Sequence, residues 1–209
     1  MRRALLAAAL LMLISQQTSA QVLSTAETLG KGTSAVLFSD NVIVPGEGID
    51  DLNIAYGQYA RGLHARFDLY LSSGATTTEG LTQVWIGGGG NVRLARIRKV
   101  SVSLFTIATV PLTHRDDACL VLLNPALIVS APLGAKVSIY SGVNSLVPIG
   151  DPKQSGSGGR RTSVAIFTPP SAKVNAPIGA TYAIGHWGLW GEADFGTLRA
   201  FGAAVTYVF

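Results

Sequence analysis

Three histidines and a scattered set of charged side chains are the residues of this sequence that could perform acid–base or nucleophilic chemistry. A nucleophilic site needs a base within hydrogen-bond reach of the nucleophile and a third group that orients the base. Among the histidines, only His114 stands directly beside carboxylates, Asp116 and Asp117. The sequence holds no Gly-x-Ser-x-Gly motif and no His-Glu-x-x-His or other zinc spacing. We therefore expect no enzyme, no metal site and no cofactor, and we interpret residues 111–117 as an exposed loop.

Four consecutive glycines, Gly87 to Gly90, have the composition of a phosphate-binding loop but not its context. Such a loop needs a following helix and usually a Lys-Ser/Thr pair, and neither is present. We expect instead a strand that bends or that allows close approach of a neighbouring segment.

Two basic segments could bind anions. Residues 148–175 are rich in Ser and Gly, contain a single acid in Asp151, and have a composition typical of a flexible loop. This loop could contact lipopolysaccharide phosphates or be merely solvated; its basic candidates are Lys153, Arg160, Arg161 and Lys173. A second cluster, Arg93, Arg96, Arg98 and Lys99, surrounds a predicted turn and could anchor at anionic headgroups or keep the turn soluble.

The elements that position these residues are predicted to be strands. Apolar residues alternate with smaller or polar ones over segments of about ten residues, which is the period of a strand with one apolar face. The ten predicted strands are about 33–44, 51–60, 63–73, 81–94, 99–110, 118–130, 135–147, 176–184, 187–194 and 198–209. Eight or twelve strands remain possible, because residues 164–167 could form a further short strand.

The alternation assigns a polar face and an apolar face to several strands. Leu69 and Leu71 are on one side of the third strand, with Asp68 and Tyr70 on the other. In the second strand Leu52, Ile54 and Tyr56 alternate with smaller residues. The side chains predicted to line a barrel interior are His64, Arg66, Asp68, Tyr70, Lys136, Tyr140, Asn144, Glu192 and Asp194.

The last ten residues have the most regular alternation in the chain. Phe201, Val205, Tyr207 and Phe209 fall on one face, and smaller residues lie between them. Ten residues also suffice for a tilted strand to cross a bilayer. With its terminal Phe and an aromatic residue two places earlier, this segment resembles the C-terminal strand of bacterial outer-membrane β-barrels. The resemblance implies a closed antiparallel transmembrane β-barrel that is recognised through this strand by the barrel-assembly machinery of a Gram-negative cell.

The spacers between the predicted strands agree with that architecture. For most of the chain longer spacers alternate with shorter ones, as long external loops alternate with tight periplasmic turns in such barrels. An even number of strands also brings both termini to the periplasmic side. A soluble β-sandwich is the competing architecture, since its strands alternate too.

The start of the chain has the three parts of a secretory signal peptide. Arg2 and Arg3 precede an apolar run at residues 4–14, and Thr18-Ser19-Ala20 provides a small-x-small cleavage site. We expect a signal peptide at 1–20, a periplasmic lead-in at 21–32 and the barrel at 33–209.

Composition supports a lipid-embedded β protein and argues against nucleic acid as a partner. The 16 Lys and Arg residues include Arg2 and Arg3, so the chain after the leader has 14 against 12 Asp and Glu. Only 13% of residues are charged, where about 25% is usual for soluble domains. Cys119 is the single cysteine, which excludes an intramolecular disulfide.

These features predict a non-enzymatic envelope protein, either structural or a narrow pore with a polar, charge-paired lumen. An enzyme acting on lipid A, phospholipid or peptide at the external rim is an alternative, and a surface binding protein acting through residues 148–175 is another. The expected partners are outer-membrane lipid, lipopolysaccharide and the assembly machinery. The number of subunits is left open.

Overall fold

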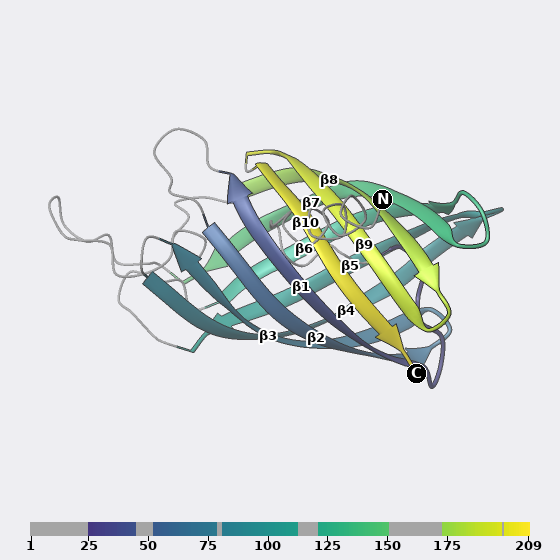
Figure 1. The fold of residues 1–209 in the computed structure, drawn as a ribbon, viewed down its shortest axis with the longest axis horizontal. Helices are drawn as coiled ribbons and strands as arrows, with labels where there is room; N and C mark the ends of the chain where they lie inside the picture. Colours follow the sequence, from purple (N-terminus) through teal and green to yellow (C-terminus); the bar gives the residue numbers. More distant parts are fainter. Residues whose placement is uncertain (1–24, 45–51, 79–80, 113–120, 151–172, 198) are drawn as a thin grey trace, which may run out of the picture.

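A single closed sheet forms the molecule. The computed structural model describes residues 25–44, 52–78, 81–112, 121–150, 173–197 and 199–209. Its ten strands are β1 (Ser34–Val44), β2 (Leu52–His64), β3 (Phe67–Thr78), β4 (Leu81–Ile97), β5 (Val100–Pro111), β6 (Val121–Pro132), β7 (Val137–Ile149), β8 (Lys173–Ile184), β9 (Trp187–Gly196) and β10 (Arg199–Val208). Each strand pairs antiparallel with its sequence neighbours, as Figure 1 shows.

The barrel closes where the first strand meets the last. β1 pairs with β10 from Ala35 opposite Val208 to Val44 opposite Arg199. Reciprocal hydrogen bonds of 2.9 Å between the backbones of Ser34 and Phe209 continue this ladder to the end of the chain. Every strand therefore has two partners, which removes the unpaired edges that a lipid environment cannot satisfy. The predicted closed barrel of ten strands is confirmed, and the sandwich is excluded.

The two ends of the barrel differ. The end that holds the C-terminus also holds the four tight hairpin turns, at residues 65–66, 98–99, 133–136 and 185–186. We call it the turn end, and we call the opposite end, where β1 ends and β2 begins, the loop end.

The first tight turn is not where the sequence suggested. The predicted strands 51–60 and 63–73 leave a turn at Arg61-Gly62. That turn is wrong, because β2 continues to His64 and the chain reverses at Ala65 and Arg66. Gly62 is needed for a different reason: a Cβ there would overlap the backbone of Gly30. The glycine allows the segment before β1 to pack closely against β2. It does not mark a turn.

The outer wall is apolar on all sides. Outward-facing residues with large exposed areas include Phe38, Leu71, Ile86, Leu104, Val143, Ile178 and Phe201. Contiguous exposed apolar surface of this extent suits a lipid environment. Across the described part of the chain, the structure contains no helix with the length and apolar character to span a membrane.

The interior is filled by two clusters of buried side chains. The loop-side cluster consists of Leu37, Ile43, Leu52, Ile54, Tyr56, Trp85, Leu122, Leu146 and Ala204. The turn-side cluster consists of Ala26, Ala35, Ala60, Tyr70, Phe105, Ile107, Ala126, Ile128 and Tyr140. The apolar face of β2, with Leu52, Ile54 and Tyr56, therefore points into the barrel and not toward its outer wall.

Candidate functional site in the barrel interior

Two buried carboxyl groups on β9 are the centre of a polar network inside the barrel. Glu192 accepts a hydrogen bond of 2.7 Å from the Tyr140 hydroxyl on β7. Asp194 accepts one of 3.2 Å from the Asn144 amide, also on β7. The Asn175 amide on β8 donates in turn to the Asn144 oxygen at 3.4 Å. Three neighbouring strands thus share one network, in which β7 donates to the two acids of β9 and β8 donates to Asn144.

The backbone of β8 makes room for this network. A Cβ at Gly179 would overlap the phenol ring of Tyr140. Gly179 lies opposite Tyr140 on β7 and opposite Glu192 on β9. The ring can therefore lie flat over β8 and direct its hydroxyl at Glu192.

Hydrogen bonds from β7 hold both Glu192 and Asp194. The ion pairs found within the described residues both involve Glu27, with Arg93 and with Arg96. Tyr140 and Asn144 supply donors to the oxygens of these acids, which lowers the cost of burying them.

A second polar region lies at the turn end, where the lead-in enters the barrel. Glu27 accepts hydrogen bonds from Arg93 at 3.0 Å and from the Ser101 hydroxyl at 2.7 Å. The Leu29 backbone N–H donates to both oxygens of Asp68, at 3.2 and 3.0 Å. The lead-in residues described by the structure therefore occupy the turn end of the barrel.

Two glycines reverse the lead-in so that it can do this. Gly30 and Gly32 have φ angles of 85° and 91°, a region that side chains disfavour. The backbone N–H of Gly32 donates to the Gly62 carbonyl at 2.8 Å, and that of Gly62 to the Thr33 carbonyl at 2.9 Å. The chain folds back on itself here and continues into β1.

A bulge in β4 brings two arginines to the same carboxylate. Arg93 pairs with Ser103 and Arg96 with Ser101, and the register shifts between Arg93 and Ala95. Without the extra residue, positions three apart would point to opposite faces. The bulge turns both side chains inward, so that Arg96 lies 3.8 Å from Glu27.

A cavity of about 160 Å³ separates the lead-in from the rest of the interior. The lead-in residues Glu27 and Leu29 form one side of it, and Gln58, Asp68 and Trp190 are among the residues on the other. The Trp190 ring also meets the edge of Tyr140, with centroids 6.4 Å apart. The cavity therefore lies between the lead-in and the carboxyl network.

On the loop side, apolar side chains close the interior. Ile43 is 0% exposed, Trp85 1% and Leu122 2%. Trp85 packs against Tyr56 with ring centroids 5.9 Å apart, and its indole N–H donates to the Thr76 hydroxyl at 3.2 Å. A water-filled channel would leave such lining side chains accessible.

Six of the predicted lumenal residues lie inside the barrel. They are Asp68, Tyr70, Tyr140, Asn144, Glu192 and Asp194. The other three, His64, Arg66 and Lys136, lie exposed at turns, which corrects their placement. The first hairpin reverses at residues 65–66, so His64 lies just before that turn and Arg66 within it. Lys136 lies in the turn that precedes β7.

The remaining predicted sites divide between the outer wall and regions outside the described residues. Phe201, Val205 and Phe209 are exposed on the outer wall, and Tyr207 is partly buried against Trp187. Lys173 begins β8 and so is not in the long loop. Five residues singled out in the sequence lie outside the described residues: Lys153, Arg160, Arg161, His114 and Cys119.

The contacts of Glu27 and the packing of Trp85 were not predicted. The lead-in has few bulky residues, so nothing in its own composition indicates that it binds inside the barrel. The sequence of β2 did contain a signal for the apolar interior. Its bulky residues alternate with small ones, and small residues can face either lipid or the interior, so the bulky face was free to point inward.

No family model and no curated protein matches this chain. Among solved structures, a KdgM porin is similar over 85% of this chain and 99% of the porin, with 8% identity and a TM-score of 0.43. The function must therefore be inferred from the geometry of the barrel itself.

Proposed function

We propose that this chain is a non-enzymatic outer-membrane barrel of a Gram-negative envelope, with a closed interior and a structural role. The observation that carries the proposal is the inaccessibility of the inward-facing side chains, from Ile43 and Trp85 on the loop side to Phe105 and Asp68 on the turn side. In an open porin such residues would contact water.

The location is supported by the two surfaces of the sheet. The outer wall presents apolar residues on every side, while the charged groups among the described residues, other than Asp40, lie inside or near the ends. A charged side chain at the bilayer midplane costs about 2–4 kcal/mol when it is Arg or Lys, and less when it is Asp or Glu. The proposed signal peptide and the aromatic C-terminal strand point to the same compartment.

The proposal of a non-enzymatic role is supported by the surroundings of the two described histidines. His64 accepts a hydrogen bond from the backbone N–H of Arg66 at 3.3 Å, and His186 contacts the Val208 carbonyl at 2.9 Å. Both bond to backbone in exposed turns. Neither is placed as a base for the buried carboxyls of Glu192 and Asp194.

A gated narrow pore is a second candidate, favoured by the way in which the lead-in is held. Its contacts with Asp68, Arg93 and Ser101 are polar, and Ala26 adds an apolar one. A segment held in this way could leave the barrel. The apolar loop-side cluster would still have to rearrange before ions could pass, which makes this the weaker candidate.

The proposal is tested by locating the protein and by removing it. The mature chain is expected in the outer-membrane fraction, with heat-dependent migration on a gel that is lost when Phe209 is deleted. Cells without the protein are expected to take up more of a hydrophobic dye, and expression of the wild-type chain should reverse the defect. Recovery of the chain in the soluble periplasm, or dye uptake unchanged by its loss, would contradict the proposal.

A further inference from the structure

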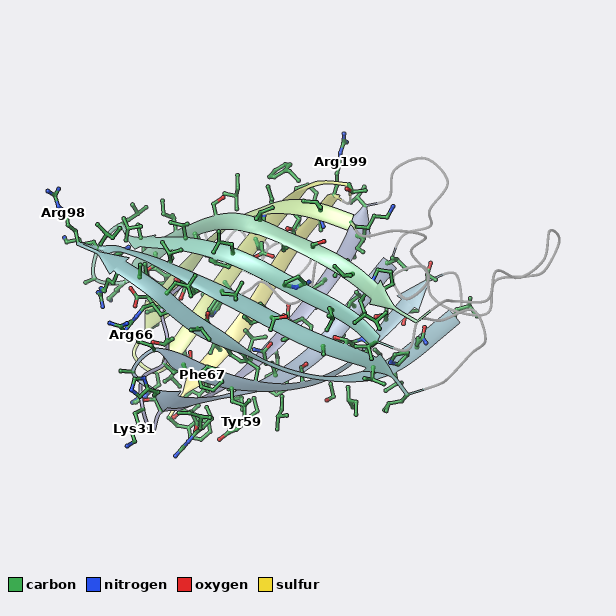
Figure 2. The ribbon with its side chains drawn as sticks, turned by 180° about the vertical axis from the view of Figure 1, so that it is seen from behind. Lys31, Tyr59, Arg66, Phe67, Arg98 and Arg199 are labelled. Atoms are coloured by element: carbon green, nitrogen blue, oxygen red, sulfur yellow. The ribbon has the colours of Figure 1, made fainter. Side chains whose placement is uncertain are left out.

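Basic side chains gather at the turn end of the barrel. Figure 2 shows Arg98 at the extreme of this end, Lys31 and Arg66 at the same end but apart from Arg98, and Arg199 toward the other end. The described cations at or near the turn end are Lys31, Arg61, Arg66, Arg93, Arg96, Arg98, Lys99 and Lys136. The lead-in carboxylate Glu27 is engaged with Arg93 and Arg96, which leaves the outer part of this rim strongly positive.

The hairpin between β4 and β5 carries two of these cations beyond the neighbouring strand. Pairing of β4 with β3 stops at Val92 opposite Phe67, but β4 and β5 remain paired as far as Ile97 opposite Val100. Ile97 is 68% exposed on the outer face of this projection. Arg98, with φ 56°, and Lys99 form the turn immediately beyond it.

The adjacent hairpin between β6 and β7 adds a third cation at the same level. Ser101 of β5 lies opposite Ser130 of β6, and continuing that register brings Arg98 level with Leu133. Leu133 is 65% exposed, and Lys136 lies in the same turn. Arg98, Lys99 and Lys136 make no ion pair within the described residues.

This arrangement has the chemistry of a phospholipid headgroup site. The exposed side chains of Ile97, Val100 and Leu133 mark the edge of the hydrocarbon region, and the cations follow directly beyond it, at the depth of lipid phosphates. Arg and Lys form strong charge-assisted hydrogen bonds with phosphate oxygens. A zwitterionic headgroup already carries its own amine, whereas an anionic one leaves its phosphate charge uncompensated.

We propose that the rim formed by the β4–β5 and β6–β7 hairpins binds an anionic glycerophospholipid through Arg98, Lys99 and Lys136. The inference rests on the proposed function, because it requires the barrel to lie in a membrane. It further assigns the turn end to the leaflet that holds phospholipid.

The test compares lipids around the refolded mature chain in phosphatidylcholine vesicles. Electron paramagnetic resonance of spin-labelled phosphatidylglycerol, phosphatidylcholine and lipid A measures how strongly each associates with the barrel. The wild type is expected to prefer phosphatidylglycerol over phosphatidylcholine by at least about five-fold at low salt, the ratio that corresponds to the ~1 kcal/mol of one basic group near a surface. Added salt should reduce the preference by screening. The preference should fall to near unity in R98Q/K99Q/K136Q.

A matched control removes the same number of charges elsewhere. The K31Q/R66Q/R199Q variant should keep the preference, because its side chains lie away from the two hairpins. Equal loss in both variants, no preference in the wild type, or a stronger association with lipid A would overturn the lipid proposal. Heat-dependent gel migration of each sample separates this outcome from failure of the barrel to insert, which would count against the proposed function.

Discussion

Individual residues show how this chain places charge with respect to lipid. Asp40 is the exception on the outer wall: it is exposed in the middle part of β1, and its register partners are Ala55 and Ala203. Its carboxylate accepts a hydrogen bond from the neighbouring Asn41 backbone at 3.0 Å. A charge on the lipid-facing side opposes insertion.

Replacing Asp40 by Ala should therefore stabilise the barrel. We expect a gain of about 1–2 kcal/mol in the free energy of unfolding, because an acid on the lipid face costs less than the ~2–4 kcal/mol of a base. Urea unfolding from phosphatidylcholine vesicles measures the change. Destabilisation by D40A would show that the hydrogen bond from Asn41 outweighs the cost of exposing the carboxylate to lipid.

Tyr140 has the opposite role, because its hydroxyl satisfies a buried acid. The Y140F variant should lose about 1–3 kcal/mol of stability, since Glu192 would keep its burial and lose a donor. The same substitution at Tyr182, which is 42% exposed on the outer wall, is the control and should change little. Equal unfolding midpoints for Y140F and the wild type would show that the hydrogen bond does not contribute.

At the scale of elements, alternation in the sequence was sufficient to predict ten strands and most of their boundaries, because each strand has one face toward lipid. Alternation was not sufficient where a residue's role depends on contact with a segment distant in the sequence or on an irregularity in the strand. Gly62 suggested a turn, but it is small because the lead-in packs on it. Arg93 and Arg96 could not be placed on one face without knowledge of the bulge between them.

The docking of the lead-in depends on Glu27. In the E27Q variant the contacts with Arg93 and Ser101 lose their charge assistance. We expect docking to weaken by about 1 kcal/mol, at the low end for a charge-assisted hydrogen bond because the group is partly exposed. Hydrogen exchange of residues 25–33 should become faster by roughly five-fold while the β1–β10 ladder stays protected. Unchanged exchange in this segment would show that Glu27 does not hold it.

The packing of β8 against the carboxyl network can be tested with two glycines on adjacent strands. The G179A variant should be clearly destabilised, because the new methyl group would overlap the Tyr140 ring. The G191A variant should be tolerated, since the nearest atom to its added Cβ is the Gly202 carbonyl oxygen at 3.8 Å. Similar refolding yields and unfolding midpoints for both variants would argue against the placement of Tyr140 over β8.

For the molecule as a whole, the barrel is a closed sheet with lipid-compatible residues outside and packed side chains inside. The turn side holds the lead-in and a cavity of about 160 Å³, the two buried acids follow on β9, and the loop side is closed by the cluster around Trp85. This packing supports the proposal that the barrel does not connect two compartments.

Single-channel conductance of the refolded mature chain in a planar bilayer tests the closed interior most directly. The wild type is predicted to give no discrete current steps, and E27Q is predicted to give none either, because the loop-side cluster remains intact. Replacing Trp85 and Leu122 together by Ser is expected to produce steps, provided that heat-dependent gel migration shows the variant to be folded. Reproducible steps from the folded wild type would contradict the account and establish an open lumen.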